Sequence, residues 1–285
     1  MQSPQPSLTL AALWMCGWLA AMVTMAVAGR ETVSQLSAFQ VMELRAIIGF
    51  FLLLPLVFAG GGFAAMRTQH PWRHVWRNVV HYGAQYAWLV AVTLIPLAQV
   101  ISIEFTMPIW TAILAVLFIG EKLNRWKVIA IVLGLVGVLV IVRPAVDQVD
   151  IGQTYALASA FGFSVSVILV KALTRTDSVV RIIFWMLIIQ GIIGAIPAYL
   201  VWQPIDNDLW PWLFLVALCG TFSHYCMARA MTHADATIVV PMDFLRVPLT
   251  ALVGWLIYAE VIDVYTALGA LMIMAGNLLN LKKPS

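Results

Sequence analysis

Residues 86–137 read YAWLVAVTLIPLAQVISIEFTMPIWTAILAVLFIGEKLNRWKVIAIVLGLVG, and much of this pattern returns 139 positions later as residues 225–276, YCMARAMTHADATIVVPMDFLRVPLTALVGWLIYAEVIDVYTALGALMIMAG. The two stretches align without a gap. Apolar similarity alone would exchange Leu and Val freely, but it would not keep acidic residues and a tyrosine in register. The matching positions include Tyr86 with Tyr225, Glu104 with Asp243, and Glu121 with Glu260. The sequence therefore indicates an internal duplication.

The composition identifies lipid as the solvent of this chain. Of its 285 residues, 62% are hydrophobic and only 10% are charged, whereas soluble domains carry roughly 25% charge. The net charge of +3 gives no reason to expect a nucleic-acid partner. The three cysteines lie in apolar runs, which favours packing over disulfides, and we expect neither a metal nor a cofactor. These cysteines are Cys16, Cys219 and Cys226.

Ten apolar segments are long enough, or nearly so, to cross a bilayer, which takes about 20 residues. They are residues 8–28, 38–58, 75–94, 97–118, 126–142, 151–172, 180–202, 209–231, 235–258 and 262–281. The predicted class is an all-α membrane protein with a first repeat at 8–142, a second at 151–281, and tails at 1–7 and 282–285. The first ten residues, MQSPQPSLTL, lack a basic region, and no cleavage site precedes Arg30. We therefore expect a retained first helix and not a signal peptide.

The distribution of Lys and Arg predicts the orientation. Eleven lie on the side of the two termini and two on the other side, so both termini are expected in the cytoplasm. Each repeat holds five predicted helices, an odd number, so the second repeat should cross the membrane inverted relative to the first. Inverted repeats are typical of secondary transporters, in which the two halves exchange inward-open and outward-open conformations.

The duplicated segments resemble the EamA-type signature of the drug/metabolite transporter superfamily. The resemblance is carried by residues 108–144, PIWTAILAVLFIGEKLNRWKVIAIVLGLVGVLVIVRP, by residues 247–279, VPLTALVGWLIYAEVIDVYTALGALMIMAGNLL, and by ELRAIIGF at 43–50. It implies ten helices around a central cavity lined mainly by helices 1, 3, 4, 6, 8 and 9. It does not identify the substrate, because such proteins export amino acids, import metabolites or move drugs. One departure is that Gly120 of the first repeat becomes Ala259 in the second.

Charged side chains within the spans are costly and are therefore functional candidates. Arg45 and Glu104 each lie about seven residues, on the order of 10 Å, from the outer ends of their helices, so we predict that they face each other. This pair could hold two helices together, act in gating or recognise substrate charge. Asp243 is the inverted counterpart of Glu104. Arg246 follows it by three residues, so it shares a helix face with Asp243 and could neutralise it.

Aromatic and polar side chains on several spans predict the lining of a substrate cavity. Polar groups that faced lipid would be unsatisfied, so we expect them to face inward. Such a cavity suits an amphiphilic or planar organic solute, although the same residues could form an ordinary packed core. The histidines could carry protons or simply form hydrogen bonds. The predicted lining is Trp14, Trp18, His81, Tyr82, Gln85, Tyr86, Glu104, Trp110, Phe163, His224, Tyr225 and Asp243.

Prolines on the duplicated elements predict hinges, because proline removes a helical hydrogen bond and permits a kink. The predicted hinges are Pro108, Pro241 and Pro248. The paired acids Glu121 and Glu260 stand at helix ends, where capping the next helix or stabilising a closed gate is expected more than substrate binding.

Together these features predict a secondary transporter that moves a small organic metabolite across the inner membrane by alternating access. The favoured substrate is an amino acid or a related amphiphilic solute. Import of a nucleoside-like, riboflavin-like or S-adenosylmethionine-like solute is the alternative. An intramembrane enzyme or a channel is the competing class, but the chain has no HExxH, G-x-S-x-G or P-loop motif and no catalytic residue is assigned. The expected partners are lipid, substrate and protons as a candidate coupling ion, with the protein a monomer or weak homodimer.

Overall fold

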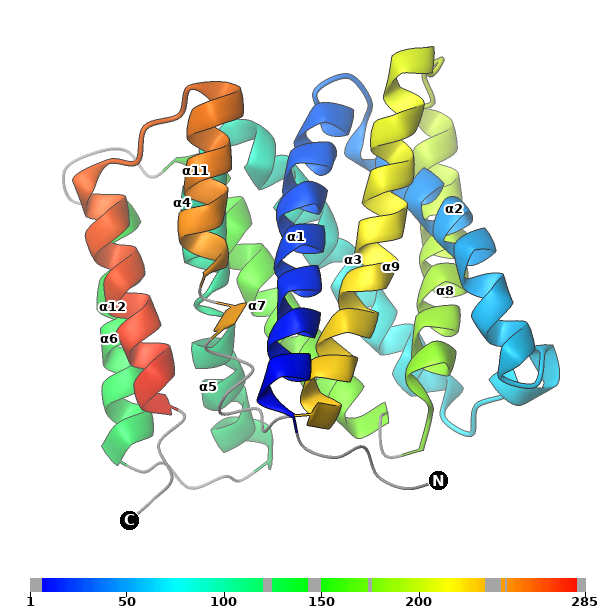
Figure 1. Cartoon of the computed structure of the whole chain (residues 1–285), viewed down its shortest axis with the longest axis horizontal. Helices are drawn as coiled ribbons and strands as arrows, with labels where there is room; N and C mark the ends of the chain where they lie inside the picture. The colour runs from blue at the N-terminus through cyan, green and yellow to red at the C-terminus, as the bar shows by residue number, and fades with distance from the viewer. Residues whose placement is uncertain are drawn as a thin grey trace. The chain divides into compact units, whose positions relative to one another are not determined.

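The computed structural model describes residues 7–119, 125–142, 150–173, 176–233, 242–243 and 245–280, and every regular element in these ranges is helical (Figure 1). The α-helices are α1 (Leu8–Val33), α2 (Ala38–Ala59), α3 (Pro71–Leu94), α4 (Leu97–Glu104), α5 (Met107–Ile119), α6 (Arg125–Val142), α7 (Ile151–Leu173), α8 (Val179–Leu200), α9 (Trp210–His233), α11 (Arg246–Tyr258) and α12 (Val264–Asn280). Two short 3-10 helices are η1 (Phe63–Met66) and η2 (Asn207–Leu209).

Among the described residues, five helical segments are long and apolar enough to cross a membrane. They are Leu8–Val33, Ala38–Ala59, Ile151–Val170, Val179–Leu200 and Asn207–Met227. Three shorter apolar helices are Ile131–Val142, Arg246–Tyr258 and Val264–Leu279. The chain is therefore an all-helical membrane protein. One prediction was too simple: the span expected at 97–118 is divided into α4 and α5, which are separated by Phe105 and Thr106.

The chain forms two compact units, and each combines segments from both halves of the sequence. Unit 1 comprises Met1–Val79 with Ala172–Arg246, and unit 2 comprises Val80–Lys171 with Val247–Ser285. The units therefore do not coincide with the two sequence repeats, and each unit is described separately below.

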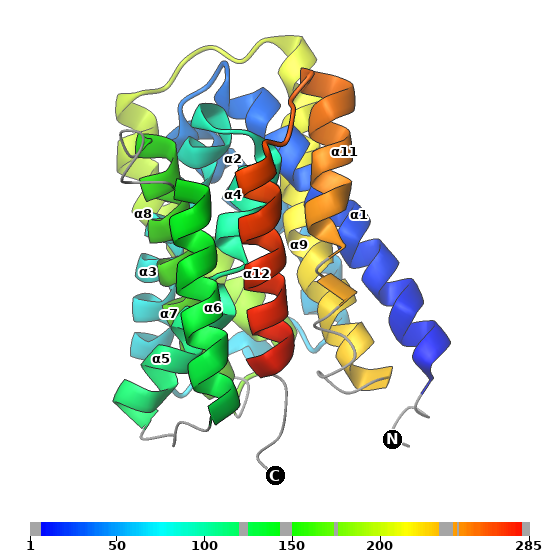
Figure 2. The same cartoon turned by 90° about the vertical axis from the view of Figure 1, so that its left-hand side faces the viewer.

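In unit 1, α1 packs along α9, and α2 packs along α8 and α9 (Figures 1 and 2). The backbone N–H of Ser7, just before α1, donates to the carbonyl of His233 at the end of α9 (3.0 Å). The beginning of one helix therefore lies beside the end of the other, and α1 and α9 run antiparallel.

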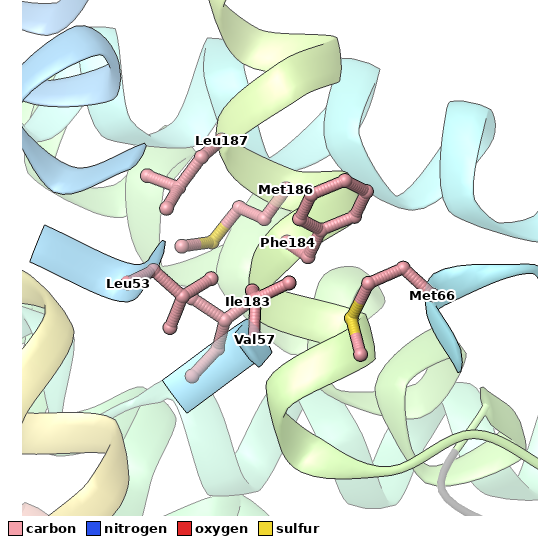
Figure 3. Packing of buried hydrophobic residues seen from close by; sticks show 7 residues of the cluster. All are labelled: Leu53, Val57, Met66, Ile183, Phe184, Met186 and Leu187. Carbon is pink, nitrogen blue, oxygen red and sulfur yellow. The ribbon is translucent and has the colours of Figure 1, made fainter. Parts of the chain in front are cut away.

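An apolar cluster holds the second half of α2 against the first half of α8 (Figure 3). Tight packing is a main source of helix association in lipid, since apolar contacts alone gain little over contacts with lipid tails. The cluster is formed by Leu53 and Val57 of α2, Met66 of η1, and Ile183, Phe184, Met186 and Leu187 of α8. This contact uses the second half of α2, so the polar residues in its first half can form contacts with other helices.

A buried carboxylate joins the connection after α2 to the connection before α8. Asp177 accepts hydrogen bonds from Thr68 Oγ1 (3.0 Å), His74 Nε2 (3.2 Å) and Arg181 Nη1 (2.7 Å). Arg181 also donates from Nε (3.0 Å) and Nη2 (2.7 Å) to the carbonyl of Ala65. The Asp177 side chain is only 1% exposed, so this cluster fixes two loops through one acid.

In unit 2, α6 and α12 pack antiparallel with their backbones close together (Figure 2). A Cβ added to Gly137 would lie 2.8 Å from the carbonyl oxygen of Gly269, and one added to Gly269 would lie 2.5 Å from the carbonyl oxygen of Gly137. Glycine is therefore required at both positions. Small residues at close crossings are typical of membrane helices.

Glu260 caps a helix, but not the one that follows it. Its Oε2 accepts a hydrogen bond from the backbone N–H of Leu97, the first residue of α4 (3.1 Å). The following helix α12 is instead capped by Asp263, whose Oδ1 accepts from the N–H groups of Tyr265 (2.9 Å) and Thr266 (3.0 Å). The capping prediction for Glu260 was thus right in kind and wrong about the helix. Its counterpart Glu121 lies outside the described residues.

Ala259, where the repeats differ, adopts a left-handed backbone with φ of 53° directly after the end of α11. A left-handed residue is common at this position after a helix and is usually glycine, because other side chains are strained there. We expect Ala259→Gly to stabilise the protein by about 1 kcal/mol and to raise the midpoint of thermal unfolding. Gly83→Ala, at an exposed helical position with open space around it, is the comparison variant. A midpoint for Ala259→Gly below that of the wild type would contradict the argument.

Candidate functional site

The predicted site residues divide between the two units. Unit 1 contains Trp14, Trp18, Arg45, His224, Tyr225, Asp243 and Arg246, and unit 2 contains His81, Tyr82, Gln85, Tyr86, Glu104, Pro108, Trp110, Phe163 and Pro248. The predicted pair of Arg45 with Glu104 has one member in each unit and stays a prediction. Pro241 lies outside the described residues.

In unit 1, Asp243 receives bonds from two helices. Its Oδ1 accepts a hydrogen bond from the indole Nε1 of Trp18 in α1 (2.6 Å), and its Oδ2 lies 3.3 Å from Arg246 Nη2 at the start of α11. The Arg246 side chain is 4% exposed and that of Asp243 is 15% exposed. Charge-assisted hydrogen bonds of this kind are stronger than neutral ones. Asp243 is therefore a partly accessible carboxylate whose position is set by Trp18 and Arg246.

An aromatic group lies one turn away from Trp18 on α1. The ring of Trp14 meets that of Tyr225 edge-on, with centroids 5.7 Å apart and an interplanar angle of 80°. The guanidinium of Arg229 lies 5.5 Å from the centroid of the Trp14 ring. This contact places a cation against an aromatic face. Met15 and Ala230 form the buried core between α1 and α9.

A second polar group in unit 1 was not predicted as a set. Arg45 Nη1 of α2 donates to Gln190 Oε1 of α8 (3.3 Å), and Gln190 Nε2 is 3.4 Å from Asn78 Oδ1 of α3. Asn78 Oδ1 also accepts from Arg77 Nη1 (2.8 Å). All four side chains are buried. The Arg45 guanidinium packs where Gly220 of α9 leaves room, since a Cβ there would be 3.0 Å from Arg45 Nε.

The spacing of polar residues along α3 could have predicted part of this group. Arg77 was counted among the cytoplasmic positive charges because the span was expected to begin at residue 75. The helix begins at Pro71 instead, which places Arg77 about 9 Å along it at 1.5 Å per residue. Polar residues then follow the helical repeat on one side of α3, at His74, Arg77, Asn78, His81, Tyr82 and Gln85. The cavity prediction had included only the last three.

In unit 2, His81 of α3 meets α7. Its Nδ1 lies 3.3 Å from Ser166 Oγ, and its ring centroid is 5.2 Å from that of Phe163. Ser166 was not predicted as a partner. Tyr82 and Gln85 are buried on the same helix, and Tyr86 is half-buried, so these polar groups lie within the protein as expected for groups that avoid lipid.

Glu104, the counterpart of Asp243, is also bonded to a tryptophan. Its Oε2 accepts a hydrogen bond from the indole Nε1 of Trp88 in α3 (2.9 Å), and both side chains are buried. The two duplicated acids therefore each accept an indole N–H, although Trp18 and Trp88 do not occupy equivalent positions in the repeats. This common feature became visible only with the side chains in place.

The break between α4 and α5 is stabilised by a side chain from α12. Asn277 Nδ2 donates to the carbonyl of Phe105 (2.8 Å), which the interrupted helix leaves available. Trp110 Nε1 donates to Thr106 Oγ1 (3.1 Å), and its ring contacts that of Phe161 edge-on at 5.7 Å. Pro108 is the second residue of α5, and proline fits a first helical turn because it needs no N–H partner there.

Removing the Asn277 amide should weaken this break. We expect Asn277→Leu to cost about 1–3 kcal/mol, because the buried carbonyl of Phe105 loses its donor. The midpoint of thermal unfolding of the purified protein measures the cost. Asn277→Asp tests the donor specifically, since a carboxylate cannot donate, and a wild-type midpoint for both variants would show that the bond contributes nothing.

Known proteins share the sequence pattern and the fold of this chain. Within the described residues, no group of three or more His, Cys, Asp or Glu side chains could hold a metal ion. The sequence profile of the EamA-like transporter family matches residues 9–143 and again residues 150–282. A solved crystal structure superposes with a TM-score of 0.66 at 17% identity, covering 96% of each chain, which is a likeness of fold.

Curated relatives are similar over most of their length. A riboflavin transporter of Rhizobium johnstonii is 31% identical over 232 residues, covering 81% of this chain and 77% of that protein. An S-adenosylmethionine uptake transporter of Rickettsia felis is 24% identical, covering 86% and 83%. A pseudopaline exporter of Pseudomonas aeruginosa is 28% identical, covering 86% of each.

Proposed function

Because this chain belongs to the EamA-like transporter family, we propose that it is a secondary transporter that moves a small organic metabolite across the bacterial inner membrane by alternating access. The observation that carries this proposal is the match of the family to both halves of the chain. Membership of a transporter family gives no support to an enzymatic function. The proposal includes multi-pass insertion with both termini in the cytoplasm, which the distribution of Lys and Arg favours.

The proposed architecture is ten crossings arranged as two inverted repeats of five helices. It is supported by the packing of counterpart helices within each unit. In unit 1, Gly49 and Leu187 are neighbours across α2 and α8, the second helices of the two repeats. In unit 2, α6 packs with α12, and these are the fifth helices of the two repeats. Both pairs run antiparallel, as expected when the second repeat is inverted.

The proposed substrate is an amphiphilic solute with an aromatic or planar part. Support comes from Trp14 and Tyr225 close to the partly accessible Asp243 in unit 1, which combine aromatic surface with a charge. Amino acids fit this description. The printed functions of the relatives add riboflavin-like and S-adenosylmethionine-like solutes; one of the three names states uptake and one states export.

Coupling and motion are proposed at the duplicated positions. Asp243 and Glu104 are the candidate proton sites, because inverted counterparts can exchange roles between inward-open and outward-open states. Pro108 and Pro248 are the candidate hinges, since each lies in the first turn of a helix and supplies no N–H to the turn before it. We propose a monomer or a weak homodimer as the working unit.

Uptake by the purified protein in liposomes tests the proposal. Labelled tryptophan, riboflavin and S-adenosylmethionine would be presented separately, with and without an inward proton gradient. We expect saturable entry of at least one solute, competed by the unlabelled compound, and protein-free liposomes provide the baseline. If folded protein raises the entry of none of the three above that baseline, the proposed substrate range is wrong.

A further inference from the structure

The guanidinium of Arg77 is buried, and no acid among the described residues forms an ion pair with it. Arg77 is 4% exposed, and its Nη1 donates to the neutral amide oxygen of Asn78. Its Nε is buried and has no hydrogen-bond partner in the ranges that the structure describes, and no carboxylate there lies within ion-pair distance of it. A charge within a span is expensive, so a charge without a partner is a candidate for function.

The surroundings of Arg77 add positive charge. Arg45 lies on the same chain of hydrogen-bonded side chains as Arg77. The groups that bridge the two arginines are the amides of Asn78 and Gln190. Amide oxygens accept hydrogen bonds but carry no net negative charge. The two cationic side chains are therefore linked to each other through neutral acceptors.

Other arginines of unit 1 provide the comparison. Arg181 lies 2.7 Å from a carboxylate oxygen of Asp177, and Arg246 lies 3.3 Å from one of Asp243. These two arginines are thus each paired with an acid from their own sequence neighbourhood. Arg77 has no such partner among the residues that the structure describes, which makes an anionic group of a bound solute a candidate partner.

We propose that Arg77, supported by Arg45, Asn78 and Gln190, binds an oxyanion group of the transported solute, a carboxylate or a phosphate. The planar guanidinium suits both groups, because its donors match two oxygens at once. This inference rests on the proposed transport function and narrows it to solutes that carry an anionic group. Neutral riboflavin would then be a poorer ligand than its phosphorylated form.

Matched pairs of probes test the proposal by calorimetric titration of the purified full-length protein. Two pairs differ in a carboxylate: tryptophan with tryptophanamide, and S-adenosylmethionine with its decarboxylated form. The third pair differs in a phosphate: riboflavin 5′-phosphate with riboflavin. The measured quantity is the ratio of affinities within a pair, so a general loss of stability would lower both affinities and leave the ratio unchanged.

Three variants separate charge, geometry and position. Arg77→Gln removes the charge, and Arg77→Lys keeps the charge but loses the planar fork. Arg73→Gln removes an exposed arginine one turn earlier on the same helix and is the matched control. Gel filtration confirms that each variant is folded, and Arg77→Lys serves as the test if Arg77→Gln does not fold.

In the wild type and in Arg73→Gln, we expect the anionic member of at least one pair to bind about tenfold or more tightly than its partner. That preference should disappear in Arg77→Gln and shrink in Arg77→Lys. A preference in a carboxylate pair or in the phosphate pair identifies the source of the oxyanion. Equal binding within every pair, or a preference that survives both substitutions, would overturn the inference and leave the transporter proposal intact. No binding of any probe by folded protein would overturn the proposed substrate range and, with it, this inference.

Discussion

Replacing Asp243 with asparagine is expected to lower saturable solute uptake by the reconstituted protein at least about tenfold, equivalent to about 1.4 kcal/mol or more. Asparagine keeps the shape of the side chain and can still accept the Trp18 indole bond, so the change removes mainly the negative charge. The buried Arg246 then loses the carboxylate that lies 3.3 Å away. Breaking a buried ion pair from one side is strongly unfavourable.

Two further variants test whether the loss of uptake comes from the charge of Asp243. Asp206→Asn removes an exposed acid from the connection after α8 and should leave uptake at the wild-type rate. Trp18→Phe removes the indole donor and keeps the charge, so we expect a smaller loss than for Asp243→Asn. Uptake by Asp243→Asn within twofold of the wild type would show that the charge of Asp243 is dispensable.

Replacing Asp177 with alanine is expected to produce the largest loss of stability in the chain, about 3–5 kcal/mol. The substitution leaves the buried His74 and Thr68 without their shared acceptor, and Arg181 without its carboxylate. Thermal unfolding of the purified protein measures the loss. Asp208→Ala, at an exposed position in η2, is the control, and equal midpoints for the two variants would refute the assigned role.

The same acid predicts a dependence of stability on pH. Burial raises the pKa of Asp177, but the hydrogen bonds from Arg181, His74 and Thr68 outweigh burial and hold the pKa below the ordinary value of 3.8. A carboxyl with a lowered pKa in the folded state contributes stability that is complete above its unfolded pKa. The wild type should therefore lose this stability as the pH falls below about 3.8, and Asp177→Asn should show no such component.

The sequence was sufficient for the parts of the fold that depend on composition and repetition. Apolar runs separated by short polar links predict membrane helices whatever their neighbours are, and several expected boundaries, such as 38–58 for Ala38–Ala59, agree closely. The break at Phe105 and Thr106 was missed because the surrounding run is continuously apolar. The interruption is compensated by Asn277, which lies 172 positions further along the chain, and such a partner has no local signature.

The candidate site was harder to predict because its residues acquire meaning from distant partners. Asp243 and Glu104 could be identified as charges within spans, but the indole donors Trp18 and Trp88 could not be assigned to them by spacing. Arg77 was not grouped with the polar residues that follow it, because the predicted span begins at residue 75 whereas the helix begins at Pro71. A search for polar residues at helical spacing from residue 71 onward would have found it.

The most direct test of the central claim, a carrier that alternates between two faces, is counterflow. Liposomes with the purified protein would be loaded with unlabelled solute and diluted into buffer that contains a trace of the labelled solute. Entry of the labelled solute would then be followed over time. Tryptophan, riboflavin or S-adenosylmethionine would be used, according to which enters fastest. We predict transient accumulation of label above equilibrium, because a loaded carrier returns faster than an empty one. Entry that stops at equilibrium whatever the internal concentration, together with single-channel currents, would contradict the account and indicate an open pore.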